Sequence, residues 1–299
     1  MIGAVDIGGT KIAVGMVDDA GQVVYSSEFA TEQVKNDPAS GIAKIAEIIN
    51  HSSYPCEGVG IGCTGPVFSD SGTLGYVEFL PGWTGIHLVQ ELESACHKPV
   101  VLENDANAAA LGEWAWGAGQ KADHFMMVTV GTGIGVGVIL NGKVYSGAGG
   151  SHPEMGHQTI LAGEGPVCFC GSRGCWESLA SGTAMERWAQ ENHPEHKKLS
   201  GRELCGLAES GDPFAQKVVQ RTANFLGIGL ANLVTIWMPE LICLSGGIMK
   251  ASHLFLPEIQ RVIKQNCGLV PADQVKISLA KLGSHTGLIG AAQVYLQQK

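Results

Sequence analysis

The sequence predicts an α/β protein, because short apolar strands alternate with amphipathic helices along the chain. A second observation is an internal repeat: the strand–glycine turn–strand pattern of residues 5–15 returns at residues 130–137. A third is that glycine gathers at strand ends, and not in a low-complexity tract. We therefore expect a duplicated β-sheet core and two domains, with the boundary near residue 118.

The first half of the chain is expected to open with three strands joined by tight turns, followed by alternating helices and strands. Leu88 and Leu92, for example, share the apolar face of an amphipathic helix. The predicted elements are strands 2–5, 12–17 and 23–29, helix 39–49, strand 58–63, helix 88–96, strand 99–102 and helix 104–116.

The second half repeats the three-strand opening, and Asn141-Gly142 indicates a type I′ hairpin turn. We expect the last helix to return to the first domain, so that residues 1–117 and 287–299 form a small domain and residues 118–286 a larger one. The predicted elements are strands 125–130, 134–140 and 143–146, helices 177–190, 203–210 and 214–238, strand 241–244, helix 254–265, strand 275–280 and helix 287–297.

Composition excludes several classes of protein. A net charge of −9 does not provide the positive field of a dedicated nucleic-acid binder. No uncharged apolar segment approaches the roughly 18 residues that a membrane span needs. The chain opens on a strand-like segment with no signal peptide, and its scattered cysteines suit a reducing compartment, so we expect a cytoplasmic protein without a membrane partner.

Three cysteines and a histidine fall within nineteen residues, as His157, Cys168, Cys170 and Cys175. Thiolate and imidazole are the usual ligands of tetrahedral zinc, so the sequence predicts a zinc site on these four residues. The alternative is a set of buried or disulfide-bonded cysteines. Two carboxylates that a purely structural zinc site does not need, Glu154 and Glu177, flank the cluster.

Glycine loops with threonine lie between apolar strands, and glycine lets successive N–H groups point at one anion. A tight hairpin is the alternative for each loop alone, and neither the dinucleotide nor the Walker A pattern fits. Asp6, at the end of the first strand, suits Mg²⁺ or a water bound to it. The candidate ATP-binding and phosphate-binding residues are Asp6, Gly8, Gly9, Thr10, Lys11, Gly131, Thr132, Gly133, Gly246 and Gly247.

An acidic residue, Asp105, stands at a predicted strand-to-helix junction in the run Glu103-Asn104-Asp105-Ala106-Asn107. Asn and Asp are ordinary helix N-caps, which would explain one of these polar residues but not all of them. A carboxylate at such a junction can also accept a proton from a bound hydroxyl group when a phosphate lies opposite. That arrangement is what a small-molecule kinase needs.

With these residues the chain resembles the ROK family of sugar kinases and sugar-responsive repressors over essentially its whole length. The zinc pattern is the specific part of the resemblance, whereas the glycine loops occur across the actin-like ATPases. The matching segments are Asp6–Lys11, Glu103–Asn107, Gly131–Gly135, Glu154–His157, Cys168–Glu177 and Ser245–Gly247.

The resemblance implies an actin/hexokinase-like (ribonuclease H-like) two-domain ATPase fold and a kinase acting on ATP and a hexose, with Mg²⁺ and Zn²⁺ and as a homodimer. It implies that Asp105 is the catalytic base on the sugar hydroxyl. It also implies that sugar hydroxyls are held by Asn104, Asp105, Glu154, His157 and Glu177. His157 would then serve zinc with one ring nitrogen and sugar with the other. We therefore expect zinc removal to weaken hexose binding far more than ATP binding, since the phosphate loops lie elsewhere in the sequence.

The hexose stays open. Many family glucokinases carry Asn-Leu-Pro-Gly-Trp where this chain has Phe79-Leu80-Pro81-Gly82-Trp83, and Ser151–His157 looks more like family fructokinases. The three-cysteine cluster looks like glucokinases and N-acylhexosamine kinases, so the 6-hydroxyl of glucose leads, with fructose, mannose and N-acylhexosamines as alternatives. A non-catalytic repressor-like protein is the other class. Repressors of this family carry a DNA-binding domain ahead of the first glycine loop, which here begins at residue 6.

Overall fold

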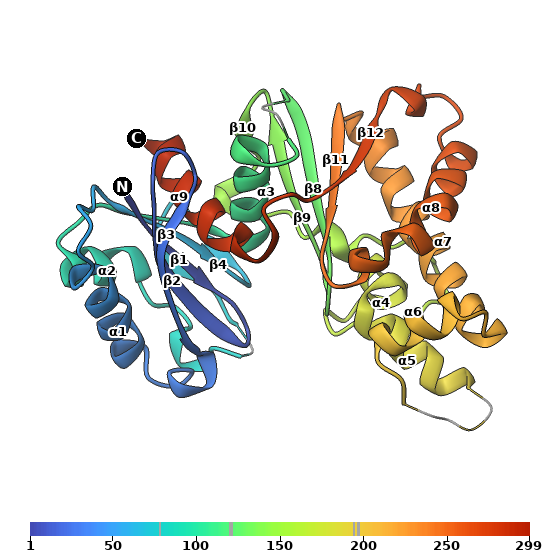
Figure 1. Ribbon diagram of the computed structural model, residues 1–299, viewed down its shortest axis with the longest axis horizontal. Helices are drawn as coiled ribbons and strands as arrows, with labels where there is room; N and C mark the ends of the chain where they lie inside the picture. Colours follow the sequence, from blue (N-terminus) through green and yellow to red (C-terminus); the bar gives the residue numbers. More distant parts are fainter. Residues whose placement is uncertain (78, 120–121, 194, 196–197) are drawn as a thin grey trace. The chain divides into compact units, whose positions relative to one another are not determined.

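The computed structural model describes residues 1–77, 79–119, 122–193, 195 and 198–299 (Figure 1). The strands are β1 Ile2–Ile7, β2 Lys11–Val17, β3 Val23–Ala30, β4 Val59–Cys63, β5 Val67–Phe68, β6 Thr73–Leu74, β7 Val100–Asn104, β8 His124–Val130, β9 Ile134–Leu140, β10 Lys143–Val144, β11 Leu241–Ser245 and β12 Lys276–Leu279.

The helices alternate with these strands, as expected for an α/β protein. The α-helices are α1 Pro38–Asn50, α2 Leu88–Cys96, α3 Asp105–Trp116, α4 Trp176–Ala180, α5 Gly182–Asn192, α6 Gly201–Glu209, α7 Pro213–Trp237, α8 Ser252–Asn266 and α9 Thr286–Gln298. Short 3₁₀ helices cover Thr31–Gln33, Pro81–Trp83, Ala148–Gly150, Met155–His157, Ile248–Ala251, Ala272–Gln274 and Gly283–His285.

Within the described residues, two five-stranded sheets carry the fold, and their strand orders match. The first has the order β3-β2-β1-β4-β7 and the second β10-β9-β8-β11-β12, so each places a three-strand meander beside two later strands. The chain divides into two compact units. Unit 1 comprises Met1–Met127, Gly137–Pro153 and Ala280–Lys299, and unit 2 comprises Val128–Val136 and Glu154–Leu279. The duplicated core predicted from the repeated glycine turns is therefore present.

In unit 1 both faces of the first sheet are covered. Alternate residues of β1 point to opposite faces, because side chains in a strand have a period of two. Val5 and Ile7 belong to the core beneath α1 and α2, whereas Ile2 and Ala4 pack with the apolar residues of α9 (Figure 1). The last helix of the chain thus completes the core built by its first strand.

The parallel strands β1, β4 and β7 end at the same edge of that sheet. Asp6 pairs in register with Gly62, and Gly62 pairs with Glu103, so the three strands finish level with one another. The carboxyl ends of parallel strands are the usual place for ligands in α/β folds. Asp6 and the Asn104-Asp105 pair are therefore brought to one edge by the strand register.

In unit 2 the long helix α7 packs against α8, and its N-terminus is capped by the Asp212 side chain, which accepts from the Ala215 amide at 2.7 Å. A Cβ on Gly227 would lie 2.6 Å from Cβ of Val262, and one on Gly229 would overlap the Trp176 ring. Glycine therefore lets α7 approach both α8 and α4 closely. None of the described helices is long and apolar enough to cross a bilayer.

Two predicted elements differ in extent. The helix expected over 177–190 is two helices, because Ser181 adopts extended backbone angles and caps α5 by accepting from the Ala184 amide at 3.1 Å. The strand expected over 143–146 ends at Val144, and Ser146 instead donates to the Glu103 carboxylate at 3.1 Å. The hairpin before it forms as predicted, with Asn141 and Gly142 both at positive φ.

Candidate active site

Two carboxylates, Asp6 and Asp105, mark the sheet edge of unit 1. Burial raises the pKa of Asp6 to about 6, with the negative charge of Asp105 adding to the rise and Lys11 opposing it. Burial also raises the pKa of Asp105, which the Ala106 amide and the Thr64 hydroxyl counter by donating to its carboxylate. A pair of desolvated carboxylates that repel each other suits a divalent cation, since Mg²⁺ prefers oxygen ligands.

The start of α3 determines the position of Asp105. Asn104 caps this helix, and its side-chain oxygen accepts from the Ala106 amide at 2.8 Å and the Asn107 amide at 3.4 Å. Asp105 then occupies the first helical position, where the helix dipole favours a negative charge. The sequence left open whether Asp105 is a cap or a base, and in the structure the cap is Asn104.

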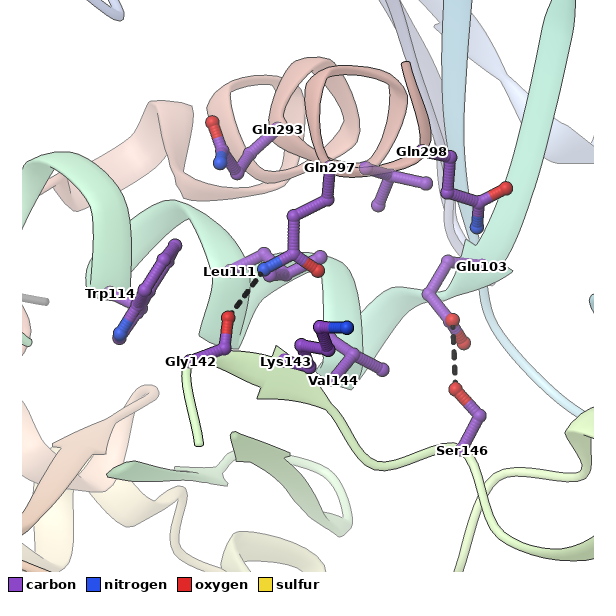
Figure 2. A pocket seen from close by; sticks show the side chains of 11 residues that line it. Glu103, Leu111, Trp114, Gly142, Lys143, Val144, Ser146, Gln293, Gln297 and Gln298 are labelled. Carbon is purple, nitrogen blue, oxygen red and sulfur yellow. Dashed lines mark hydrogen bonds between the residues drawn. The ribbon is translucent and has the colours of Figure 1, made fainter. Parts of the chain in front are cut away.

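Behind this segment lies Glu103, a carboxylate that is only 4% exposed. One of its oxygens accepts from the Asn104 amide at 2.8 Å and from Asn107 Nδ2 at 3.0 Å, and the other accepts from the Ser146 hydroxyl (Figure 2). Glu103 thus holds the Asn104–Asn107 segment in place from its buried side. It faces a separate cavity of about 460 Å³, which is lined also by Trp114 and by glutamines of α9 (Figure 2).

The first glycine loop joins β1 to β2. The Gly8 amide donates to the Lys11 carbonyl at 3.0 Å, and the Thr31 hydroxyl donates to the Gly8 carbonyl at 2.7 Å. Gly9 and Thr10 are exposed at its tip, and Lys11 forms an ion pair with Glu28 on the neighbouring strand. The ring of Phe79 lies against Gly9, so the residue that departs from the family glucokinase pattern packs on this loop.

The second glycine loop joins β8 to β9 in unit 2 and is closed by a bond from the Gly131 amide to the Gly133 carbonyl at 2.9 Å. The Gly182 amide, at the start of α5, donates to the Gly131 carbonyl at 2.7 Å. A cavity of about 700 Å³ opens beside the loop. Its lining includes predicted residues Gly131, Thr132 and Gly247, together with residues that the sequence did not single out, namely Thr183, Glu186, Arg202, Glu209 and Lys250.

The predicted zinc ligands come together in unit 2. The ligand atoms of His157, Cys168, Cys170 and Cys175 all lie within 4.8 Å of one another. Cys168 Sγ is 3.5 Å from His157 Nδ1, and Cys170 Sγ is 3.6 Å from Cys175 Sγ. Tetrahedral zinc with Zn–S bonds near 2.3 Å needs ligand atoms about 3.8 Å apart, so the cluster fits the ion. His157 presents Nδ1 to the cluster, which leaves Nε2 for another partner.

Glu177 has a role that the sequence did not indicate. Its Oε2 accepts from the Ile134 amide at 2.8 Å, so the carboxylate holds the second glycine loop where that loop enters β9. The expectation that zinc and the phosphate loops are independent was based on their separation in sequence. Separation in sequence is not separation in space here, because Glu177 lies two residues after Cys175 and accepts from the loop directly.

Comparisons with known proteins agree with this fold. The family model described as "ROK family" matches residues 2–298. A glucokinase of Halalkalibacterium halodurans is 33% identical over 99% of this chain and 94% of its own length. Among solved structures, a ROK hexokinase from Thermus thermophilus is 36% identical with a TM-score of 0.84, each chain being covered to at least 98%.

A ROK glucokinase from Streptomyces griseus, solved in complex with glucose and AMPPNP, is 33% identical with a TM-score of 0.81 over 99% of both chains. A second class of relative is the xylose repressor of Bacillus subtilis, which is 30% identical over 98% of this chain and 76% of its own length.

The fold is the actin/hexokinase-like α/β fold, and with this site it defines an ATP-dependent sugar kinase. The chain belongs to the ROK family.

Proposed function

We propose that the protein transfers the γ-phosphoryl group of ATP to the 6-hydroxyl of glucose or a closely related hexose, with Asp105 as the general base. The observation that carries the proposal is the partly desolvated Asp105, which is fixed at the start of α3 beside Asp6 at one sheet edge. Phosphoryl transfer asks a protein mainly for alignment and charge neutralisation, plus one base for the nucleophile.

In this reaction the hexose hydroxyl gives its proton to Asp105 while its oxygen forms the new bond to the γ-phosphorus atom. The bond from that phosphorus to the β–γ bridging oxygen breaks, and ADP leaves. Asp6 would hold Mg²⁺, which supplies charge neutralisation to the phosphates when bound. The loops at Gly8–Lys11, Gly131–Gly133 and Gly246–Gly247 would bind ATP, and the cavity beside Thr132 has room for its nucleoside part.

The proposal assigns the hexose to Asn104, Asp105, Glu154, His157 and Glu177, as the family resemblance implies. Zinc would be held by His157 Nδ1 and the three thiolates, and Nε2 would donate to a sugar hydroxyl. Zinc in this place supports the sugar-binding residues and does not activate the nucleophile. Glucose leads because relatives named glucokinase match the chain end to end. The homodimer and the cytoplasmic location stay predictions.

The test is a coupled ADP-release assay with glucose, mannose, fructose, N-acetylglucosamine and N-acetylmannosamine. Asp105→Asn keeps the shape of the side chain but removes the proton acceptor, so turnover should fall roughly 10²–10⁴-fold with hexose affinity nearly unchanged. Glu164→Gln, an exposed carboxylate of unit 2, is the matched control and should keep wild-type turnover. Near-normal turnover in a folded Asp105→Asn variant would overturn the assignment of the base.

The second candidate function is that of a non-catalytic sugar sensor, which the similarity to a xylose repressor favours. The same assay separates the two functions. A sensor would bind a sugar without releasing ADP in its presence, whereas the kinase releases one ADP per sugar phosphate formed.

A further inference from the structure

Buried neighbours and hydrogen bonds at the start of α4 hold the backbone of Glu177 in place. It lies in the first turn of α4, directly after the buried Cys175 and Trp176. The Trp176 amide donates to the Gln158 carbonyl at 2.8 Å, and the Ser178 hydroxyl donates to the Cys175 carbonyl at 2.8 Å. The orientation of Glu177 is therefore set by these hydrogen bonds and by the packing of α4 beside the candidate zinc ligand Cys175.

The Glu177 carboxylate contacts the backbone of the second glycine loop. Its Oε2 accepts from the Ile134 amide at 2.8 Å, and a Cβ added to Gly133 would lie only 2.3 Å from the same oxygen. Glycine at position 133 is what allows this contact. A hydrogen bond to an ionised acceptor is stronger than one between neutral groups, so the contact is a firm anchor for the loop.

The segment Glu154–His157, which contains a predicted zinc ligand, also lies close to Ile134, on the side of its carbonyl group. A Cβ on Gly156, between Glu154 and His157, would lie 2.1 Å from the Ile134 carbonyl oxygen. The Ile134 residue is thus held at its N–H by Glu177 and closely approached at its C=O by Gly156. Both contacts come from segments that contain predicted zinc and sugar ligands, and the loop has little freedom where it enters β9.

We infer that Glu177 is a positioning residue for the ATP loop as well as a sugar ligand, and that it couples hexose binding to ATP binding. This inference rests on the proposed function. A carboxylate has two oxygens: Oε2 anchors Ile134, and Oε1 is left for a hexose hydroxyl. A hydroxyl bound at Oε1 restricts the carboxylate, which in turn restricts the loop that receives the phosphates. Each substrate should then raise the affinity of the other by the same factor.

The decisive measurement is calorimetric binding of AMPPNP to hexose-free protein. Glu177→Ala removes the loop anchor, so AMPPNP affinity should fall about tenfold or more, in line with the loss of a hydrogen bond to a charged group. Glu177→Gln keeps an oxygen that can accept from Ile134, so AMPPNP affinity should stay within about threefold while glucose affinity falls. In steady state, the alanine variant should raise both KM values and the glutamine variant mainly that of the hexose.

A role as sugar ligand alone predicts a different result: both variants lose glucose affinity, and AMPPNP affinity of the hexose-free protein stays within twofold of wild type. That result would overturn the inference. The control is Glu164→Ala, which removes an exposed carboxylate of the same unit and should change neither affinity.

A substitution in the second glycine loop should also change the affinity for glucose, if the loop and Glu177 are coupled. Gly133→Ala pushes the Glu177 carboxylate off the loop, so glucose affinity measured without nucleotide should fall several-fold. Gly268→Ala is the matched control, because Gly268 is an exposed residue of the same unit where a Cβ meets nothing within 4 Å, and it should leave glucose affinity unchanged. Equal glucose affinities in the two variants would contradict the coupling.

Amide hydrogen exchange at Ile134 provides a readout that needs no ligand. Exchange should be faster in Glu177→Ala and near wild type in Glu177→Gln and Glu164→Ala, since the anchor is lost only in the first. Unchanged exchange in Glu177→Ala would overturn the positioning role itself. Faster exchange in a protein that phosphorylates no hexose would instead refute the proposed function and leave the loop contact established.

Discussion

Asp6 is a residue whose chemistry depends strongly on its neighbours. It is the penultimate residue of β1 and lies near Asp105, and the N-terminus of α9 approaches so closely that a Cβ on Gly287 would lie 2.1 Å from Asp6 Oδ2. Burial and the second carboxylate raise the pKa of Asp6 to about 6 from 3.8. The folded protein therefore binds a proton at Asp6 over a pH range in which the unfolded chain does not.

The sign of the resulting pH dependence follows from linkage. Between pH 3.8 and about 6 the native state holds the extra proton, so the contribution of Asp6 to stability falls as pH rises through this window. Asp6→Asn removes the buried charge. The variant should gain stability over wild type at pH 7, and this gain should shrink by roughly 1 kcal/mol at pH 5.

Urea unfolding at the two pH values, without Mg²⁺, measures this difference. The exposed residue Asp19 supplies the control variant Asp19→Asn, which also replaces one carboxylate by an amide. A gain from Asp6→Asn that is equal at both pH values would show that the Asp6 carboxylate is not desolvated in the native protein. Kinase activity of Asp6→Asn should fall at both pH values, since the proposed ligand of Mg²⁺ is lost.

Among the elements, α3 and α9 make the closest helix contact in unit 1. A Cβ on Gly112 of α3 would lie 2.9 Å from the Gly290 amide nitrogen, and a Cβ on Gly290 would lie 2.1 Å from the Ala108 carbonyl oxygen. Because the clashing atoms belong to the backbone, they cannot move away by a change of rotamer, as side-chain atoms can. This contact brings the last helix against the helix that carries Asp105.

Gly290→Ala should therefore destabilise the protein by roughly 1–3 kcal/mol, the usual range for an overpacked core. Gly206→Ala, in the exposed part of α6 where a Cβ meets nothing within 4 Å, should instead stabilise it by about 0.5–1 kcal/mol. Chemical denaturation of both variants gives the comparison. An unchanged free energy of unfolding in Gly290→Ala would contradict this prediction, because it would mean that α9 can shift away from α3 without loss of stability.

At the scale of the whole molecule, the zinc cluster should affect unit 2 and leave the core of unit 1 intact. Cys170→Ser removes an exposed ligand, so the zinc content should fall from one per chain towards zero. Metal-binding energy contributes to the folding of its site, so residues 154–177 should lose protection against hydrogen exchange. Ile134 should lose it too, because Glu177 anchors that residue.

Elemental analysis and exchange mapped by mass spectrometry check this prediction, with Cys56→Ser as the control thiol of unit 1. Both glucose and AMPPNP affinity should fall in Cys170→Ser, the former roughly 10–100-fold for a lost hydrogen bond to a charged group. Purified wild-type protein without stoichiometric zinc would contradict the metal site. Loss of glucose affinity alone would contradict the link through Glu177.

The elements were predictable because their signals are local. The period of apolar residues and the Asn-Gly turn depend on neighbours in sequence, and they placed β8, β9 and α7 close to their observed bounds. The clustering of His157, Cys168, Cys170 and Cys175 was predictable for the same reason, since four residues within nineteen positions need only short turns to meet. The split between α4 and α5 was missed because a serine inside an apolar helical pattern is not by itself a stop signal.

The sequence by itself determined the fold class, the family resemblance, the Cys/His cluster of the predicted zinc site and the polar run that contains Asp105. Only the tertiary structure decided how distant residues act on one another. Glu113 accepts from the amides of Lys281 and Leu282 at 2.8 Å each, a contact across more than 160 residues that no local pattern marks. Glu177 was assigned to sugar from its motif, yet its carboxylate accepts from the Ile134 amide in the second glycine loop. Such contacts depend on strand register and helix packing, which determine the direction of each side chain only once the chain has folded.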